Sequence, residues 1–314
     1  MMQPIFLSPI FQERIWGGQK LKTLFGYDLP YERTGECWAI SAHPNGQSVV
    51  REGTFTGLTL GELWASHPEL FQSSSPRFPL LTKILDASDN LSVQVHPNDE
   101  YANLHENGEL GKTECWYILD AEPGAEIIYG HAAQTKEQLI SYIKEGKWDD
   151  LLTKVPVQAG DFFYVPSGTI HALGKGIVVL ETQQSSDTTY RVYDYNRMDK
   201  DGNTRELHLE KAIDVTTIPQ VYVPTKPEQQ NEDGIIITKL VSNEFFTVQK
   251  WDITNNVTLP AHTKYTICSV IAGQGSLQIG SESYALTKGD HFILPVNFGE
   301  YTLKGDFSVI ISRE

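Results

Sequence analysis

The sequence contains little cysteine and no long apolar run. Its 314 residues include only Cys37, Cys115 and Cys268, which lie far apart and form no Cys-x-x-Cys pair. We therefore expect neither a zinc cage built from thiolates nor a redox dithiol, and so few cysteines are typical of a reducing compartment. Without an apolar stretch of about 18 residues, we expect no membrane-spanning helix. The N-terminus also lacks the features of a signal peptide, so we expect a cytoplasmic protein.

Positive charge is also scarce. Lysine and arginine number 25 against 40 aspartates and glutamates, which gives a net charge of −15. A protein this acidic is not expected to bind nucleic acid or an anionic membrane nonspecifically. A small anionic substrate would need a local cluster of basic side chains. The sequence is compatible with a monomer or a homodimer.

Short segments with the composition of β-strands dominate the chain. They are rich in β-branched and aromatic residues and are bounded by Gly, Pro, Asn or Asp, as in 78–85, 91–96, 115–119, 161–166 and 177–182. Many short strands with turn signals between them favour β-sandwiches or barrels. We therefore predict a mainly β protein.

A few helical segments interrupt this pattern. We predict helices over 59–71, 135–147 and 206–214, the first of which begins with the capping box Thr59-Leu60-Gly61-Glu62. The polar, proline-containing stretch 224–234 predicts a linker. We therefore predict a first domain over 1–223 that carries the helical insertions. A second domain of almost pure strand pattern is predicted over 235–314.

Residues that suit a metal site occur in three segments of the predicted first domain. Gln94 and His96 are two positions apart on a predicted strand, so their side chains project from the same face. Glu114 stands at the start of the next apolar strand, and His171 follows a turn after Pro166. Two imidazoles and a carboxylate suit zinc with room for further oxygen ligands, and non-haem iron often uses the same set. The competing interpretation is a group of unrelated structural residues.

Several motifs resemble those of a known family. The spacing Gly160-x5-Pro166-x-Gly168-x2-His171 resembles the second signature of the cupin superfamily, and His96 with Glu114 resembles an extended first signature. Five segments then follow in the order found in type I mannose-6-phosphate isomerases: Ile15-Trp16-Gly17-Gly18, Gly35-Glu36-Cys37-Trp38, Gln94-Val95-His96-Pro97, Lys112-Thr113-Glu114 and Glu181-x5-Asp187-x3-Arg191. The resemblance runs from the N-terminus to about residue 215.

The resemblance carries expectations for the fold and the cofactor. It implies two cupin-like β-barrels of the jelly-roll type with small helical insertions. It also implies one Zn²⁺ per chain, with the family's ligands falling on Gln94, His96, Glu114 and His171. The second barrel is predicted to be metal-free, because the turn that matches the His171 motif continues as Asn297-Phe298-Gly299 and has no histidine.

The resemblance also implies an activity. The family interconverts mannose 6-phosphate and fructose 6-phosphate by moving a proton between C1 and C2 through an enediol. The catalytic arginine of the family falls on Arg191, which we interpret as an electrostatic stabiliser or substrate clamp because guanidinium stays protonated. Glu181, Lys112 and a metal-bound water are candidates for the acid/base. Lys112, Asp187, Arg191 and Arg197 are predicted to bind the substrate, the cations holding its phosphate.

Two other functions are compatible with the residues. One is a different cupin metalloenzyme, such as an iron-dependent dioxygenase, which would need a redox-active metal and would consume oxygen. The other is a non-catalytic sugar-binding protein with two cupin domains, which would bind its ligand without turnover. Gln94 and the Arg191 motif argue against the first, and the intact set of candidate ligands argues against the second.

Overall fold

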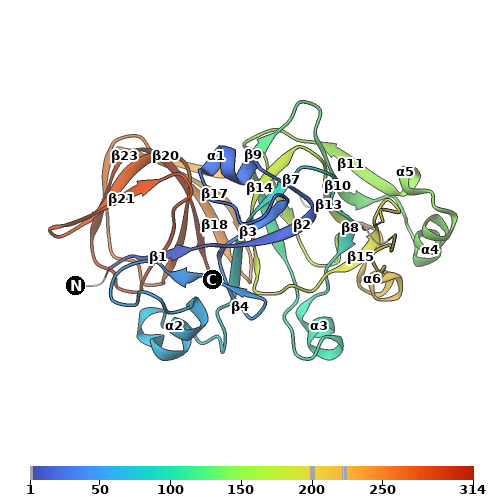
Figure 1. Cartoon of the computed structure of the whole chain (residues 1–314), viewed down its shortest axis with the longest axis horizontal. Helices are drawn as coiled ribbons and strands as arrows, with labels where there is room; N and C mark the ends of the chain where they lie inside the picture. Colours follow the sequence, from blue (N-terminus) through green and yellow to red (C-terminus); the bar gives the residue numbers. More distant parts are fainter. Residues whose placement is uncertain (1–2, 199–201, 221, 223–224) are drawn as a thin grey trace.

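Two lobes built mostly from β-strands lie side by side in the computed structural model, which describes residues 3–198, 202–220, 222 and 225–314 (Figure 1). The C-terminal third of the chain forms most of one lobe, and strands from the middle of the chain form the other. The first strands of the chain run between the two lobes. The mainly β class predicted from the sequence is confirmed.

A ten-stranded sheet forms the C-terminal lobe. Its main path is β16 (Glu228–Glu232), β17 (Ile235–Ser242), β18 (Thr247–Ile253), β23 (Tyr301–Arg313), β20 (Thr266–Ile279), β22 (His291–Leu294), β1 (Ile5–Ser8) and β6 (Val49–Val50). Two further strands branch from it, β19 (Asn256–Leu259) beside β23 and β21 (Glu282–Thr287) beside β20. Because β1 pairs with β22, the start of the chain extends the sheet of the C-terminal lobe.

Two sheets form the other lobe. The six-stranded sheet contains β12 (Phe162–Val165), β9 (Glu114–Ala121), β14 (Ile177–Gln184), β7 (Leu80–Ala87), β3 (Thr34–Ile40) and β2 (Ile10–Gly18). The five-stranded sheet contains β11 (Leu152–Pro156), β10 (Glu126–His131), β13 (His171–Leu173), β8 (Val93–Val95) and β15 (Tyr190–Tyr193). A separate hairpin consists of β4 (Ala42–His43) and β5 (Gly46–Gln47).

The predicted linker contains a strand. Residues 228–232 form β16, which pairs along its whole length with β17, so the stretch 224–234 is not simply a connecting segment. The sequence pattern misses this strand because every side chain in it is polar and exposed, which leaves no apolar alternation. The predicted boundary at 223–224 lies outside the described residues, and the division into domains over 1–223 and 235–314 stays a prediction.

Short helices lie at the edges of the lobes. Those in the predicted segments are α2 (Leu60–Ser66) with the 3-10 turn η1 (Pro68–Leu70), α4 (Lys136–Glu145) and α6 (Leu209–Val215). Thr59 and Glu62 form the expected capping box of α2. Three helices not predicted from the sequence are α1 (Lys20–Phe25), α3 (Asp99–His105) and α5 (Trp148–Leu151). None of the helices in the described part of the chain is long and apolar enough to cross a membrane.

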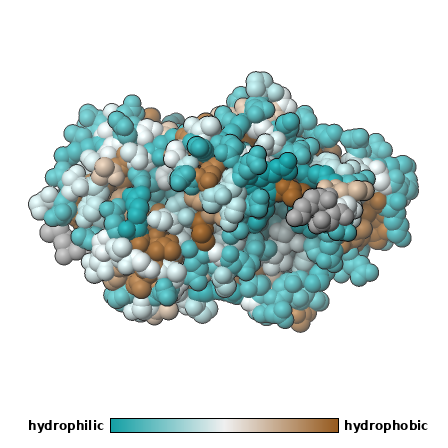
Figure 2. All heavy atoms as spheres, viewed as in Figure 1, coloured by the Kyte–Doolittle hydropathy of each residue, from teal (hydrophilic) through white to brown (hydrophobic). Residues whose placement is uncertain are grey.

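A continuous apolar core joins the two lobes. One cluster of buried side chains includes Leu7 and Phe78 together with Leu240 and Tyr265 of the C-terminal lobe. The indole of Trp64 meets the ring of Tyr265 edge to face at 6.0 Å. The three cysteines are buried as free thiols. The face of the molecule in Figure 2 is largely hydrophilic, with apolar side chains in small separate groups.

A buried histidine also connects the lobes. The hydroxyl of Tyr27 donates to the carbonyl of Gly289 at 2.9 Å, so it must accept from Nε2 of His291, also at 2.9 Å. Nδ1 of His291 then accepts from the hydroxyl of Ser269 at 2.9 Å. Burial lowers the pKa of His291 to about 4, so this ring is neutral in the folded protein.

This low pKa predicts a loss of stability in mild acid. Unfolded histidine titrates near pH 6.5, so between about pH 6.5 and pH 4 the unfolded chain binds a proton that the folded chain does not. The free energy of unfolding should therefore fall as the pH drops through this window, by up to about 3 kcal/mol from His291 alone. In His291→Gln, thermal unfolding measured at pH 7 and pH 5 should show a smaller drop in Tm than in the native protein. His105→Gln, at an exposed position, should keep the native drop, and an equal drop in all three proteins would contradict the assignment.

Candidate active site

The four predicted metal ligands lie where the five-stranded and six-stranded sheets of the same lobe face each other. Gln94 lies in β8, and His96 follows the end of that strand. His171 begins β13, which pairs with β8 directly opposite Gln94. Glu114 begins β9 of the six-stranded sheet. The five-stranded sheet and its adjoining loop therefore supply the imidazoles, and the opposite sheet supplies the carboxylate.

The two imidazoles point their Nε2 atoms at the carboxylate. Nε2 of His96 lies 3.4 Å from one oxygen of Glu114, and Nε2 of His171 lies 3.3 Å from the other. Nδ1 of His96 donates to the carbonyl of Thr188 at 2.9 Å, and Nδ1 of His171 donates to that of Thr169 at 2.8 Å. Such outer hydrogen bonds fix the orientation of metal-binding histidines. Both rings are therefore held with an unprotonated nitrogen toward Glu114.

This cluster has the properties of a divalent metal site. Its ligand atoms all lie within 4.8 Å of one another, and it is the group of this kind found among the described residues. All three side chains are buried, and no hydrogen bond of good geometry reaches either oxygen of Glu114, although the ammonium of Lys112 lies 3.0 Å from one of them. Carboxylate oxygens and unprotonated imidazole nitrogens are ligands that divalent metals accept. The donors present therefore fit a metal ion that accepts nitrogen and oxygen ligands.

The pKa values of the cluster agree with this interpretation. Burial, helped by the charge of Lys112, lowers the pKa of His96 to about 3, and burial also lowers the pKa of His171. Both imidazoles are therefore neutral, as metal ligands must be. Burial alone would raise the pKa of Glu114, but Lys112 and the two histidines hold it well below its usual range. The carboxylate is therefore ionised.

Gln94 lies beside the cluster. Its side-chain amide nitrogen is 3.4 Å from Nε2 of His171. The nitrogen and oxygen of an amide are assigned from their hydrogen bonds, and a rotated amide would direct its oxygen to the same place. Gln94 stays a predicted fourth ligand.

Lys112 is the cation nearest to the cluster. Its Nζ lies 3.0 Å from Glu114 and 3.1 Å from Nε2 of His96, and the side chain is buried. Burial works to lower its pKa, but Glu114 and Glu181 outweigh this effect and raise the pKa above the ordinary value. Lys112 is therefore an ammonium ion that donates hydrogen bonds, which argues against Lys112 as a base.

Glu181, unlike Lys112, can change its protonation state near neutral pH. It lies in β14 and is buried, and one of its oxygens accepts a hydrogen bond from the indole of Trp116 at 2.8 Å. Burial and the negative charge of Glu114 raise its pKa to about 7, although Lys112 and Lys83 oppose the change. A carboxyl group that titrates near neutral pH can both accept and return a proton.

A cavity of about 330 Å³ opens beside these residues. Its lining contains five predicted site residues, Gln94, Lys112, Glu181, Asp187 and Arg191. Four charged residues that the sequence analysis did not single out also line it, namely Arg14, Glu36, Lys83 and Arg205. Five of these side chains are cationic and three are anionic. The cavity of this acidic protein therefore contains the local basic cluster that an anionic substrate needs.

Of the three arginines Arg191, Arg197 and Arg205, which follow β14, two line the cavity and one does not. Arg191 donates to the carbonyl of Glu206 at 2.8 Å, and Arg205 binds Asp194 through Nε at 2.7 Å. Arg197 also binds Asp194, and it donates to the carbonyl of Asn90 at 2.5 Å. In the described part of the chain, the cavity lining includes Arg191 and Arg205 but not Arg197.

Two family models match the chain, "Phosphomannose isomerase type I, catalytic domain" over residues 5–123 and "Mannose-6-phosphate isomerase, cupin domain" over residues 236–314. The chain is 54% identical to the mannose-6-phosphate isomerase ManA of Bacillus subtilis (strain 168), covering 99% of both chains. It is 57% identical to the mannose-6-phosphate isomerase of Streptococcus mutans serotype c, covering 100% of this chain and 99% of the relative. The chain belongs to the type I phosphomannose isomerase family.

The fold agrees with this membership. The crystal structure of the mannose 6-phosphate isomerase from Bacillus subtilis matches the chain with a TM-score of 0.97, 51% sequence identity and 99% coverage of both chains. In this type I phosphomannose isomerase the cupin-domain model covers residues 236–314, the part of the chain for which the family resemblance implied a cupin-like domain.

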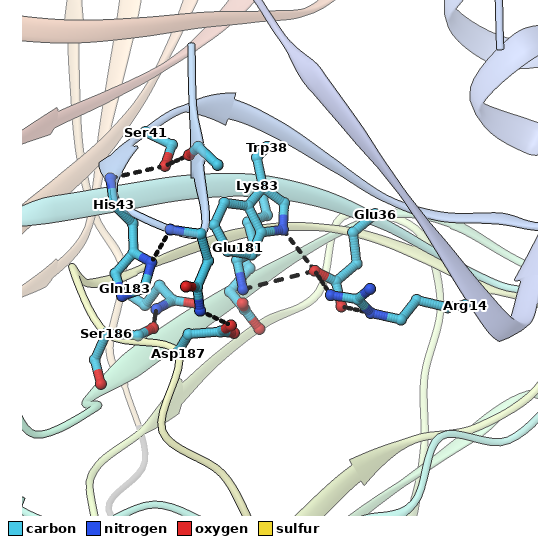
Figure 3. Close-up of polar contacts among 12 residues, drawn as sticks. Arg14, Glu36, Trp38, Ser41, His43, Lys83, Glu181, Gln183, Ser186 and Asp187 are labelled. Atoms are coloured by element: carbon cyan, nitrogen blue, oxygen red, sulfur yellow. Dashed lines mark hydrogen bonds and ion pairs between the residues drawn. The ribbon is translucent and has the colours of Figure 1, made fainter. Parts of the chain in front are cut away.

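The type I phosphomannose isomerase site also contains an ion-pair network that the sequence analysis missed. Glu36 accepts from Nε of Arg14 at 2.8 Å and from the indole of Trp38 at 2.6 Å, and Nζ of Lys83 lies 3.8 Å away (Figure 3). Burial opposes ionisation, but Lys83 and Arg14 lower the pKa of Glu36 to about 2. Glu36 lies in the motif Gly35-Glu36-Cys37-Trp38, which was a signal for its role. Lys83 lies inside an apolar strand and gave no such signal.

Proposed function

We propose that this protein is an isomerase that interconverts D-mannose 6-phosphate and D-fructose 6-phosphate by moving a proton between C1 and C2. One observation carries the proposal: Glu181, with a pKa of about 7, lines a basic cavity beside the cluster of His96, Glu114 and His171. The near-full-length relatives named above, both mannose-6-phosphate isomerases, support the same reaction.

The proposal includes the finer architecture. It places two cupin-like barrels of the jelly-roll type in the chain, a catalytic one within residues 1–223 and a metal-free one over 235–314. It places the protein in the cytoplasm. The matching cupin-domain model over the C-terminal residues and the two lobes of strands support this arrangement.

The proposed cofactor is one Zn²⁺ held by His96, Glu114 and His171, with Gln94 as the fourth ligand. Neutral imidazoles and an ionised carboxylate suit this metal, and zinc has no redox chemistry to interfere with an isomerisation. When bound, it would supply a Lewis acid that polarises oxygens of the substrate.

The side chains of the cavity would transfer the proton, stabilise the developing negative charge and bind the sugar. Glu181 takes the proton from one carbon and returns it to the other, because its pKa allows both forms near neutral pH. Lys112 stays protonated and donates to the oxygen on which negative charge develops. Arg191 provides a further fixed positive charge in the cavity, and Asp187 accepts hydrogen bonds from hydroxyls of the sugar.

The phosphate is assigned to Arg191 and Arg205, two cations that line the cavity and whose guanidinium groups can donate to its oxygens. In this proposal Arg205 takes the place of Arg197 because Arg205 is the one of the two that lines the cavity, although both guanidinium groups pair with Asp194. No relative named above favours an iron-dependent dioxygenase or a non-catalytic sugar-binding protein, and neither is proposed.

A coupled assay tests this function. Fructose 6-phosphate formed from mannose 6-phosphate is measured before chelation, after removal of metal by a chelator, and after zinc is restored. We expect turnover that the chelator abolishes and zinc restores, because Gln94 and Lys112, which contact the ligand cluster, line the cavity. Circular dichroism of the chelated sample controls for unfolding. Folded, zinc-loaded protein without turnover would contradict the proposed reaction, and full turnover by verified metal-free protein would contradict the role of the cluster.

A further inference from the structure

A small hairpin outside the large sheets reaches Asp187, one of the residues that line the cavity. β4 and β5 form a two-stranded sheet of their own, and residues 44–45 make the turn between them. The hydroxyl of Ser41 donates to the carbonyl of Gly46 at 2.5 Å, and the backbone N–H of Asn45 donates to Nδ1 of His43 at 3.2 Å. A side chain at Gly46 would meet Ile10 at 2.9 Å, so the turn packs closely on its support. These contacts hold the tip of the hairpin in place.

The tip of the hairpin binds a carboxylate of the cavity. The amide nitrogen of Asn45 donates to Oδ2 of Asp187 at 2.9 Å, across 142 residues of sequence. Asp187 lines the cavity that contains Glu181, and it also lines an adjacent cavity of about 410 Å³ together with His43 and Asn45. Figure 3 shows His43 and Asp187 in this region. Asn45 therefore holds Asp187 at the place where the two cavities meet.

The loop that carries Asp187 also orients a metal ligand. The next residue, Thr188, provides the carbonyl that accepts from Nδ1 of His96 at 2.9 Å. The backbone N–H of Thr188 donates to the hydroxyl of Ser186 at 3.3 Å. One loop thus presents both a carboxylate to the cavity and a carbonyl to the cluster, and Asn45 is its connection to the hairpin.

We propose that Asn45 is a positioning residue, whose amide holds the carboxylate of Asp187 ready to accept a hydroxyl of the sugar phosphate. The proposal rests on the isomerase function proposed above. Both side chains are exposed, so their hydrogen bond adds little to stability, since water competes for the same groups. Its effect is to restrict the Asp187 side chain before the substrate arrives, which lowers the entropy cost of binding.

The test compares variants of the zinc-loaded full-length protein. Asn45→Ala should raise the KM for mannose 6-phosphate by about 2- to 3-fold, because an exposed hydrogen bond holds Asp187 only weakly against competing water. Its kcat should stay within about 2-fold, because the bond acts on substrate binding rather than on the transition state alone. Metal content and Tm should not change. Asn45→Asp should raise KM further because it places two carboxylates together, and Asn231→Ala on the exposed strand β16 should match the native protein.

A double-mutant cycle separates positioning from other effects. If Asn45 acts through Asp187, then Asn45→Ala should cause no additional rise in KM in an Asp187→Ala background. An unchanged KM in Asn45→Ala would overturn the proposal, as would an additional loss in the Asp187→Ala background. A fall in Tm or metal content with Asn45→Ala would also overturn it, because the role would then be structural. Absence of turnover in the native protein would overturn the proposed function instead.

Discussion

Replacing His171 by alanine should remove most of the bound metal and lower kcat/KM by about 10³-fold or more. The imidazole is one of three ligands around a space only 4.8 Å across, and its other nitrogen is already bound to the carbonyl of Thr169. Alanine offers no ligand atom in its place. Metal content is measured by elemental analysis after dialysis against limiting zinc, and activity is measured by the coupled assay.

A matched control separates metal loss from a general effect of removing a buried histidine. His291→Gln changes a histidine that is as buried as His171 but belongs to the C-terminal lobe, and it should keep native metal content and turnover. The native circular dichroism of His171→Ala would show that its strands remain folded. Stoichiometric metal and native turnover in folded His171→Ala would contradict the assignment of the cluster.

The cluster could be predicted from the sequence because its information is local. Gln94 and His96 share a face through the two-residue period of a strand. His171 is fixed by a turn motif that ends in a short strand, and Glu114 begins a recognisable apolar strand. These local patterns did not indicate whether the side chains point inward, and the order of the segments, which resembles that of the family, supplied the step of bringing them together.

That Arg205 rather than Arg197 lines the cavity could not be predicted from the sequence. Arg197 and Arg205 both follow β15 in a polar segment, and both guanidinium groups bind the same carboxylate of Asp194. Arg205 lines the cavity, whereas Arg197 also donates to the carbonyl of Asn90, a residue distant in sequence. The pattern of charges along the chain does not indicate which of the two arginines lines the cavity.

The long-range pairings of the sheets were also beyond the sequence pattern. β1 pairs with β22 near the other end of the chain, with Ile5 opposite Ile293, and nothing local to either strand specifies this partner. The short helix α1 is similar, because its first backbone N–H donates to Asp86 at 2.7 Å rather than to a neighbouring capping residue. Elements stabilised by distant groups carry weak local signals.

Replacing Glu181 by glutamine should lower kcat by about 10²- to 10⁴-fold, the usual contribution of a general acid/base. Glutamine has nearly the same size and keeps an oxygen that can accept from the indole of Trp116. Fold, metal content and KM should therefore change little, while the group that moves the proton is lost. Steady-state kinetics of the zinc-loaded variant measure kcat and KM separately. Exchange of the substrate's C1 or C2 hydrogen with D₂O reports the proton transfer itself and should fall with kcat.

The pH dependence gives a second measurement of the same role. Ionised Glu181 is the form that takes the proton, and its ionised fraction falls as the pH drops through about 7. A cation bound at the neighbouring ligands would lower the pKa of Glu181 from this value, so kcat/KM should decline on the acid side at or below pH 7. Trp116→Phe removes a hydrogen bond that favours the ionised form, so its decline should begin at higher pH than in the native protein. The residual activity of Glu181→Gln should lack this decline. If zinc-loaded Glu181→Gln kept native kcat and native hydrogen exchange, another group of the cavity would have to carry the proton.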